Sequence, residues 1–141
     1  MRQSLELHVD AGDPLLRIRV ADAAVCTSGN YRRFFEVAGE RYSHIIDPRT
    51  GRPADAAPSV TVVAADAATA DAWATALSVL GAGGLALAEQ HESLEAMVVS
   101  GTAEKYGIHM TTGFRALLVE PAADPQGGGT AQVAVLKSLK R

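Results

Sequence analysis

A short run of valines followed by an amphipathic helix is the feature that most restricts how this chain can fold. Residues 59–65 are short and Val-rich, which is typical of a central, buried strand. Residues 69–80 repeat apolar side chains at helical spacing, with Thr69 as a suitable N-cap and Gly81 as the end of the helix. The sequence therefore predicts a helix that packs against a sheet. Its apolar stripe consists of Ala70, Trp73, Ala74, Leu77 and Leu80.

The rest of the chain is rich in strand patterns. Alternating apolar and polar residues predict two β-hairpins, and a second, shorter helix follows the first. These patterns predict an α+β fold, with an antiparallel or mixed β-sheet packed against one or two helices. The predicted strands are 5–9, 16–20, 23–26, 33–37, 41–46, 59–65, 94–99 and 115–119, with a further one within 105–112; 49–58 is a surface loop, and 83–90 is the second helix.

The composition indicates one globular domain with a separate tail. Hydrophobic residues make up 48% of the 141 residues and charged ones 21%, which favours a folded core over disorder. Residues 1–120 form the predicted domain, and residues 121–130 have the Pro, Asp and Gly content of a linker. Residues 131–141 are either a basic tail or a short appended element. The domain therefore ends at residue 120, and residues 121–141 form the linker and tail.

Several classes of function are excluded by charge and cysteine content. The net charge of -3 provides no basic surface for nucleic acid. The single cysteine, Cys26, excludes an internal disulfide and a Cys-based zinc site, and its neighbours Val25 and Thr27 indicate a small, half-buried side chain rather than a nucleophile. The first residues include Asp10 and Asp13 and no apolar run long enough for a signal sequence or a membrane helix. A cytoplasmic location is expected, unless an export signal lies on residues outside this sequence.

Residues 42–51 (YSHIIDPRTG) place three functional side chain types at the end of a predicted strand. His44, Asp47 and Arg49 are crowded against a turn that Pro48 and Gly51 favour. A strand end of this kind can hold side chains for chemistry. From spacing alone, a surface turn with no chemical role is the more common arrangement.

A second candidate pair lies on the predicted helix. Asp71 and Thr75 are four residues apart, so both project from one helix face and can offer oxygen ligands to a hard cation such as Mg²⁺. The alternative is an acidic residue near the helix start that complements the helix dipole, with Thr75 merely tolerated. The spacing does not decide between them.

Four segments in register point to a known family. They read SGNYRRFFE at 28–36, RYSHIIDPRTG at 41–51, SVTVVA at 59–64 and TADAWATAL at 69–77. In this order they resemble the ApbE family of Mg-dependent FAD:protein FMN transferases. The resemblance is clear over residues 25–81 and weaker to about residue 120, and it corresponds to the C-terminal part of that T-fold-like domain.

The resemblance implies a role for individual residues. Asp71, Thr75 and the backbone carbonyl of Ala74 match the Mg²⁺ ligands, and His44 matches the functional histidine of the family. Ile45 matches a contact to the flavin nucleotide. Further nucleotide-binding candidates are Tyr31, which follows Asn30 where the family more often has Asp, and Arg49, which can either meet a phosphate or pair with Asp47.

The implied reaction is the transfer of FMN from FAD to a Thr or Ser hydroxyl of a target flavoprotein, with release of AMP. FAD is thus a substrate and Mg²⁺ the cofactor. His44 is the candidate base, with Asp47 either orienting its imidazole or capping the turn. A pyrophosphate at the free N–H groups of the helix start, with His44 close to the first helical turn, is the expected arrangement.

The N-terminal part of the family has no counterpart before residue 25. In the family that part provides a Lys-bearing Gly-Ala-type segment and another metal ligand. The sequence therefore predicts a fragment of a transferase, or its Mg²⁺ and His half completed by a second chain or a dimer, or a catalytically incomplete subunit that binds flavin nucleotide or is purely structural.

Overall fold

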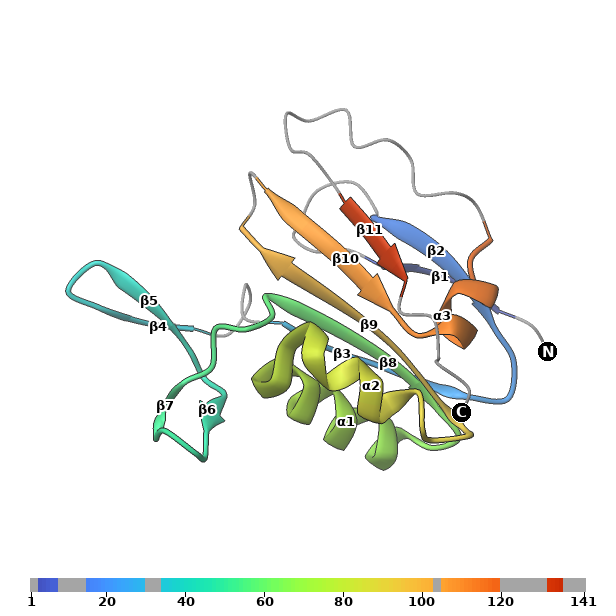
Figure 1. Ribbon diagram of the computed structural model, residues 1–141, viewed down its shortest axis with the longest axis horizontal. Helices are drawn as coiled ribbons and strands as arrows, with labels where there is room; N and C mark the ends of the chain where they lie inside the picture. The colour runs from blue at the N-terminus through green and yellow to red at the C-terminus, as the bar shows by residue number, and fades with distance from the viewer. Residues whose placement is uncertain (1–2, 8–14, 30–33, 103–104, 120–131, 136–141) are drawn as a thin grey trace.

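A five-stranded sheet forms the centre of the protein (Figure 1). The computed structural model describes residues 3–7, 15–29, 34–102, 105–119 and 132–135. The strand order is β11-β10-β9-β8-β3, and every neighbouring pair is antiparallel except β10 and β11, which are parallel. The predicted α+β class with a mixed sheet is confirmed. The strands are β3 (Ala24–Gly29), β8 (Ser59–Ala64), β9 (Leu94–Gly101), β10 (Tyr106–Met110) and β11 (Gln132–Val135).

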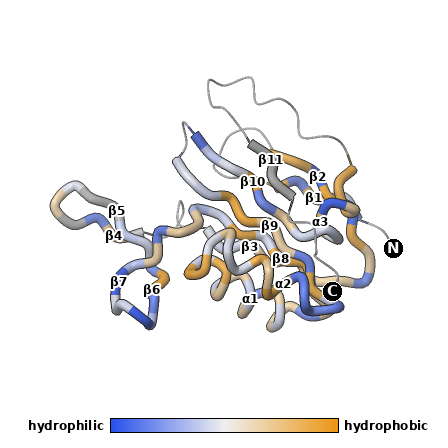
Figure 2. Tube along the Cα trace, in the orientation of Figure 1, coloured by the Kyte–Doolittle hydropathy of each residue, from blue (hydrophilic) through white to orange (hydrophobic). Residues whose placement is uncertain are grey.

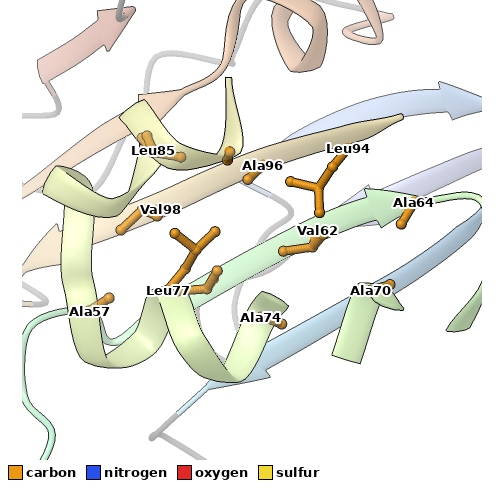
Figure 3. Packing of buried hydrophobic residues seen from close by; sticks show 12 residues of the cluster. Ala57, Val62, Ala64, Ala70, Ala74, Leu77, Leu85, Leu94, Ala96 and Val98 are labelled. Carbon is orange, nitrogen blue, oxygen red and sulfur yellow. The ribbon is translucent and has the colours of Figure 1, made fainter. Parts of the chain in front are cut away.

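Helix α1 (Ala67–Leu80) packs on one face of this sheet, together with the 3₁₀ turn η1 (Gly81–Gly84) and the short helix α2 (Leu85–Ala88) (Figure 1). The interface consists of small and aliphatic side chains: Leu77 and Leu85 meet Val62 and Val98 of the sheet (Figure 3). Alanines at positions such as Ala74 let the helix approach the strands closely. This packing fixes α1 on β3 and β8.

The opposite face of the sheet is covered by a hairpin and a short helix. The hairpin consists of β1 (Gln3–Leu7) and β2 (Leu16–Val20), and the helix is α3 (Thr112–Ala116). Their apolar residues form a second buried cluster, which includes Ile18 and Phe114. The sheet is therefore buried on both sides, and this explains why every residue of β8 is buried, including the polar Ser59 and Thr61.

Two small hairpins lie outside the main sheet and project from one end of the molecule (Figure 1). One joins β4 (Phe34–Val37) to β5 (Glu40–Ser43), and the other joins β6 (Ile46–Asp47) to β7 (Arg52–Pro53). Figure 2 shows that the turn between β6 and β7 is hydrophilic, whereas the hydrophobic residues gather on the central strands and on α1.

Several predicted boundaries are wrong for identifiable reasons. The strand predicted at 23–26 continues to Gly29, because it pairs with β8 along its full length. The strand predicted at 41–46 ends at Ser43, and the loop at 49–58 contains the two residues of β7. The second helix, predicted at 83–90, is a 3₁₀ turn followed by the single turn of α2.

Residues 115–119 were predicted as a strand, and this is also wrong. They contain the end of α3 and a turn, and their pairing with β2 is limited to the isolated antiparallel bridge between Leu118 and Ile18. The side chain of Thr111 caps this helix by accepting a hydrogen bond from the Phe114 backbone N–H at 3.3 Å, and it donates one to Glu95. Local capping thus outweighs the strand propensity of the apolar run.

The predicted tail divides at the limit of the described residues. Residues 121–130, predicted as a linker, lie outside the described part of the chain, as do His8 and Val9 of the first predicted strand. Within 131–141, residues Gln132–Val135 form β11 and add a strand to the sheet beside β10.

One stretch, Ala67–Ala88, has the length and the mean hydropathy, 1.3, of a membrane span by composition alone. Gly81 ends α1 within this stretch, and Leu77 and Leu85 are fully buried against the sheet. The apolar composition is therefore accounted for by the protein core.

Candidate functional site

Asp71 and Thr75 are exposed residues of α1, and they lie one helical turn apart on the same face. The helix begins at Ala67, two residues before the predicted start, so Asp71 is the fifth helical residue rather than part of the first turn. This position removes the alternative in which Asp71 complements the helix dipole, because that effect is confined to the first turn. The pair offers a carboxylate and a hydroxyl about one helical pitch apart.

The N-cap of α1 is Asp66, and the prediction that Thr69 is the N-cap is wrong. The Asp66 carboxylate accepts hydrogen bonds from the Thr69 backbone N–H at 2.8 Å and from the Thr69 hydroxyl at 2.7 Å. The first of these bonds is the main reason that the pKa of Asp66 is lowered. The Asp66 carboxylate therefore occupies the helix start, where the prediction put a pyrophosphate.

Cys26 makes the contact that ties the candidate cation ligand to the sheet. Its Sγ donates a hydrogen bond to Asp71 Oδ1 at 3.3 Å. Burial raises the pKa of the Cys26 thiol, and the hydrogen bond to Asp71 and the negative charge of that residue raise it further. The thiol is half-buried, as predicted, and its raised pKa keeps it protonated near neutral pH, where it acts as a donor.

Ala74, the third predicted ligand, is in a less suitable environment. Its side chain is fully buried in the helix–sheet core. Its carbonyl oxygen accepts a hydrogen bond from Ser78 Oγ at 2.8 Å. A cation at this carbonyl would have to displace that hydroxyl, so the described residues support Asp71 and Thr75 better than Ala74.

The oxygen donors of α1 fit a hard cation that is completed by other ligands. Among the described residues, no three His, Cys, Asp or Glu side chains come together as a metal cluster. Mg²⁺ commonly uses one or two carboxylates and takes its remaining ligands from water and substrate phosphates. Asp71 and Thr75 match this requirement.

His44 lies on the connection between β5 and β6 and is exposed. The next residue, Ile45, accepts a hydrogen bond from the Ala54 backbone N–H at 2.8 Å, and its own N–H donates to Ser43 Oγ at 3.1 Å. The Ile45 side chain is half-buried, and the two backbone hydrogen bonds of this residue hold the connection between β5 and β6.

The contacts that place the segment carrying His44 lie at the C-terminal end of α1, whereas the prediction put His44 near the first turn. Just after Ala54, Ala56 lies against Gly81, where a Cβ built on the glycine would be 3.1 Å from the Ala56 Cβ. The His44 segment is thus anchored near the C-terminal end of α1, and the helix start lies at the other end (Figure 1). At a rise of about 1.5 Å per residue, about 15 Å of helix separates Asp71 from Gly81.

Arg49 pairs with Asp47 in the turn between β6 and β7. Arg49 Nη2 and Asp47 Oδ2 are 2.8 Å apart, and the Arg49 backbone N–H donates to Asp47 Oδ1 at 2.8 Å. These hydrogen bonds hold the pKa of Asp47 below its usual value. Of the two roles considered for each residue, the structure shows the ion pair with Asp47 for Arg49, and the cap of the turn for Asp47. Tyr31, the remaining nucleotide-binding candidate, lies outside the described residues.

Sequence reasoning missed two residues that shape this site, Cys26 and Asp66. Asp66 could have been found, because an Asp three residues before Thr69 is a common N-cap pattern. Cys26 could not, because its partner is 45 positions away in the chain.

The fold is an α+β domain in which one helix carries an exposed carboxylate and hydroxyl four residues apart. The ApbE family model matches residues 4–98, and the chain belongs to the ApbE family.

Two curated relatives are FAD:protein FMN transferases. The one from Escherichia coli (strain K12) is 40% identical over 96 residues, which is 67% of this chain and 27% of the relative. The one from Vibrio cholerae (serotype O1, Classical Ogawa 395) is 43% identical over 103 residues, which is 72% of this chain and 30% of the relative. The chain therefore spans less than a third of the length of either.

Solved structures agree with the family assignment. The ApbE protein from Thermotoga maritima superposes with a TM-score of 0.72 at 33% identity, over 84% of this chain and 39% of its own. The apo form of the Pseudomonas stutzeri flavinyl transferase ApbE gives a TM-score of 0.64 at 34% identity, over 86% of this chain and 38% of its own. The predicted family and fold are confirmed.

Proposed function

We propose that this chain provides the Mg²⁺ and histidine part of an FAD:protein FMN transferase. The observation that carries the proposal is the placement of Asp71 and Thr75 on one exposed face of α1, in a chain of the ApbE family. The relatives named FAD:protein FMN transferase support the transfer of flavin, and the donor set of α1 supports a hard cation.

The reaction is a phosphoryl transfer between FAD and a protein hydroxyl. The hydroxyl oxygen of a Thr or Ser on the target flavoprotein forms a bond to the FMN-side phosphorus. The bond from that phosphorus to the bridging oxygen breaks, and AMP leaves with the oxygen. The hydroxyl proton passes to a base, for which His44 is the candidate in this chain.

Each residue has a separate task in this scheme. Asp71 and Thr75 would hold Mg²⁺ against the diphosphate, and Ala74 would contribute only if Ser78 gave up its carbonyl. When bound, Mg²⁺ withdraws electron density from the phosphoryl oxygens and offsets the charge on AMP. Ile45 would meet the flavin nucleotide through its backbone.

The rest of the family fold is part of the proposal. The chain spans 39% of the Thermotoga structure and 27% of the Escherichia coli relative. The segment that carries His44 contacts the C-terminal end of α1, and Asp71 is the fifth residue of that helix, so the base and the cation ligand come from different parts of the chain. A partner that carries the remaining part of the family fold would move the projecting hairpins toward the substrate.

The test is a reconstituted flavin transfer. The chain is mixed with FAD, Mg²⁺, a flavoprotein that an ApbE relative modifies, and the preceding part of that relative as partner. Covalent transfer is measured as flavin fluorescence that survives denaturing electrophoresis, and it should disappear in Asp71→Ala while circular dichroism stays unchanged. Absence of covalent flavin with and without the partner would refute the transferase proposal, and full activity in Asp71→Ala would refute the assigned ligand.

The separation of His44 from Asp71 favours one alternative, a subunit that binds flavin nucleotide without transferring it or serves a structural role. Calorimetry with FAD and Mg²⁺ distinguishes the two forms of this alternative, since a purely structural subunit would release no binding heat.

A further inference from the structure

We infer that Cys26 is a positioning residue for Asp71: its thiol holds one carboxylate oxygen and thereby directs the other toward the cation. The inference rests on the proposed function, because Asp71 is its cation ligand. Asp71 Oδ1 accepts the Cys26 hydrogen bond at 3.3 Å. Oδ2 is then the oxygen that can face Mg²⁺.

The thiol is a fixed reference point because of the strand that carries it. Cys26 lies opposite Val62 in the register between β3 and β8, and it packs against the helix-facing core cluster. Its neighbour Val25 packs against the cluster on the other face, as strand alternation requires. The backbone ladder therefore determines where the thiol lies.

Asp71, in contrast, is an exposed residue on the edge of α1 that flanks β3. An exposed carboxylate samples several rotamers, and ordering it at the moment of cation binding costs conformational entropy. A hydrogen bond from a fixed donor selects one rotamer beforehand, so less free energy is lost when the cation binds.

The test uses two Cys26 variants whose effects on folding and on cation binding run in opposite directions. Cys26→Val is apolar and suits the core cluster, but it removes the donor. Cys26→Ser keeps a donor, but it places a hydroxyl against an apolar surface. A packing role predicts that Val is tolerated better than Ser, whereas a positioning role predicts that Ser retains cation affinity and Val does not.

Mg²⁺ or Mn²⁺ binding to the full chain with FAD is measured by calorimetry and by the fluorescence of Trp73, the single tryptophan, which lies two residues from Asp71. We expect Cys26→Val to weaken binding about three- to ten-fold, and Cys26→Ser to stay within about two-fold of the unaltered chain. Urea unfolding should show the reverse order of stability.

A matched control lies on the same strand. The Thr27 hydroxyl, on the other sheet face, is 2.9 Å from the Thr61 hydroxyl, so Thr27→Val removes a hydroxyl without reaching Asp71. This variant should leave cation affinity unchanged. In an Asp71→Ala background, Cys26→Val should have no further effect on binding, because the group that it orients is gone.

The outcomes separate the two proposals. If the unaltered chain binds neither Mg²⁺ nor Mn²⁺ with FAD present, the proposed cation site is wrong and this inference fails with it. If the unaltered chain binds and Asp71→Ala does not, but Cys26→Val binds as tightly as the unaltered chain, only the positioning role is overturned. Weakened binding in Cys26→Ser equal to that in Cys26→Val would also overturn it.

Discussion

Replacing Leu77 with Ala should remove much of the free energy that holds α1 on the sheet. Leu77 is fully buried and lies at the centre of the helix–sheet interface, between Leu85 and the strand residues Val62 and Val98 (Figure 3). The same helix carries Asp71, so the position of the candidate site depends on this contact.

The magnitude follows from the surroundings of Leu77. A buried Leu→Ala change costs about 2–5 kcal/mol, and the cost is highest where neighbours cannot fill the cavity. Alanines such as Ala57 and Ala74 belong to the same cluster and have no side-chain freedom with which to close the gap. We therefore expect a loss of about 3–4 kcal/mol, which is a large share of the roughly 5–15 kcal/mol typical of a domain. The corresponding fall in Tm is about 10 °C.

Urea and thermal unfolding, followed by circular dichroism, measure this loss. The matched control is Leu87→Ala on α2, because 51% of the Leu87 side chain is exposed. The control should change the unfolding free energy by less than about 0.5 kcal/mol. A Leu77→Ala loss below about 1 kcal/mol, or one equal to that of the control, would refute the assignment of this core.

Two further predictions concern the backbone and the helix cap. Gly101→Ala should destabilise the protein by more than about 2 kcal/mol in urea unfolding, because Gly101 has φ +96° and a Cβ built there lies 2.3 Å from the Lys105 carbonyl oxygen. The neutral control is Gly83→Ala, because a Cβ built on Gly83 meets nothing within 4 Å. Since the pKa of Asp66 is lowered in the folded state, its contribution is present above its unfolded pKa, about 4, and is lost as pH falls through the lowered value. The stability difference between the unaltered chain and Asp66→Ala should therefore shrink in unfolding curves recorded from pH 6 down to pH 3, and a difference that is constant with pH would contradict the cap.

Local patterns in the sequence predict the elements that are stabilised by their own periodicity. The sequence predicts the buried strand at 59–65 from its short, Val-rich run. It predicts the helix at 69–80 from apolar residues that repeat at 3.6 residues and from Gly81 at its end. The hairpin between β4 and β5 was found from its turn, where Ala38 and Gly39 both have positive φ.

Long-range pairing explains what was missed. The extension of β3 to Gly29 depends on hydrogen bonds to β8, which is 30 residues or more further along the chain. The position of β11 depends on its parallel pairing with β10, which the local sequence of 131–141 does not predict. The placement of His44 depends on where Ala56 packs, so the resemblance to a family could identify the residue but not its distance from Asp71.

The two parts of the candidate site differ in what fixes them, and this difference has a consequence for function. Asp71 is held by a core helix and by Cys26 on the main sheet. His44 lies between two hairpins that pair with no strand of that sheet, and two-stranded hairpins are marginally stable by themselves. These hairpins expose apolar side chains, with Phe35 at 58% and Ile46 at 48% of their full exposure. Cation binding through Asp71 should therefore depend on the core of this chain together with ligands from the substrate and from the rest of the family fold, whereas transfer, which needs His44 close to the same phosphate, should also depend on what covers the hairpins.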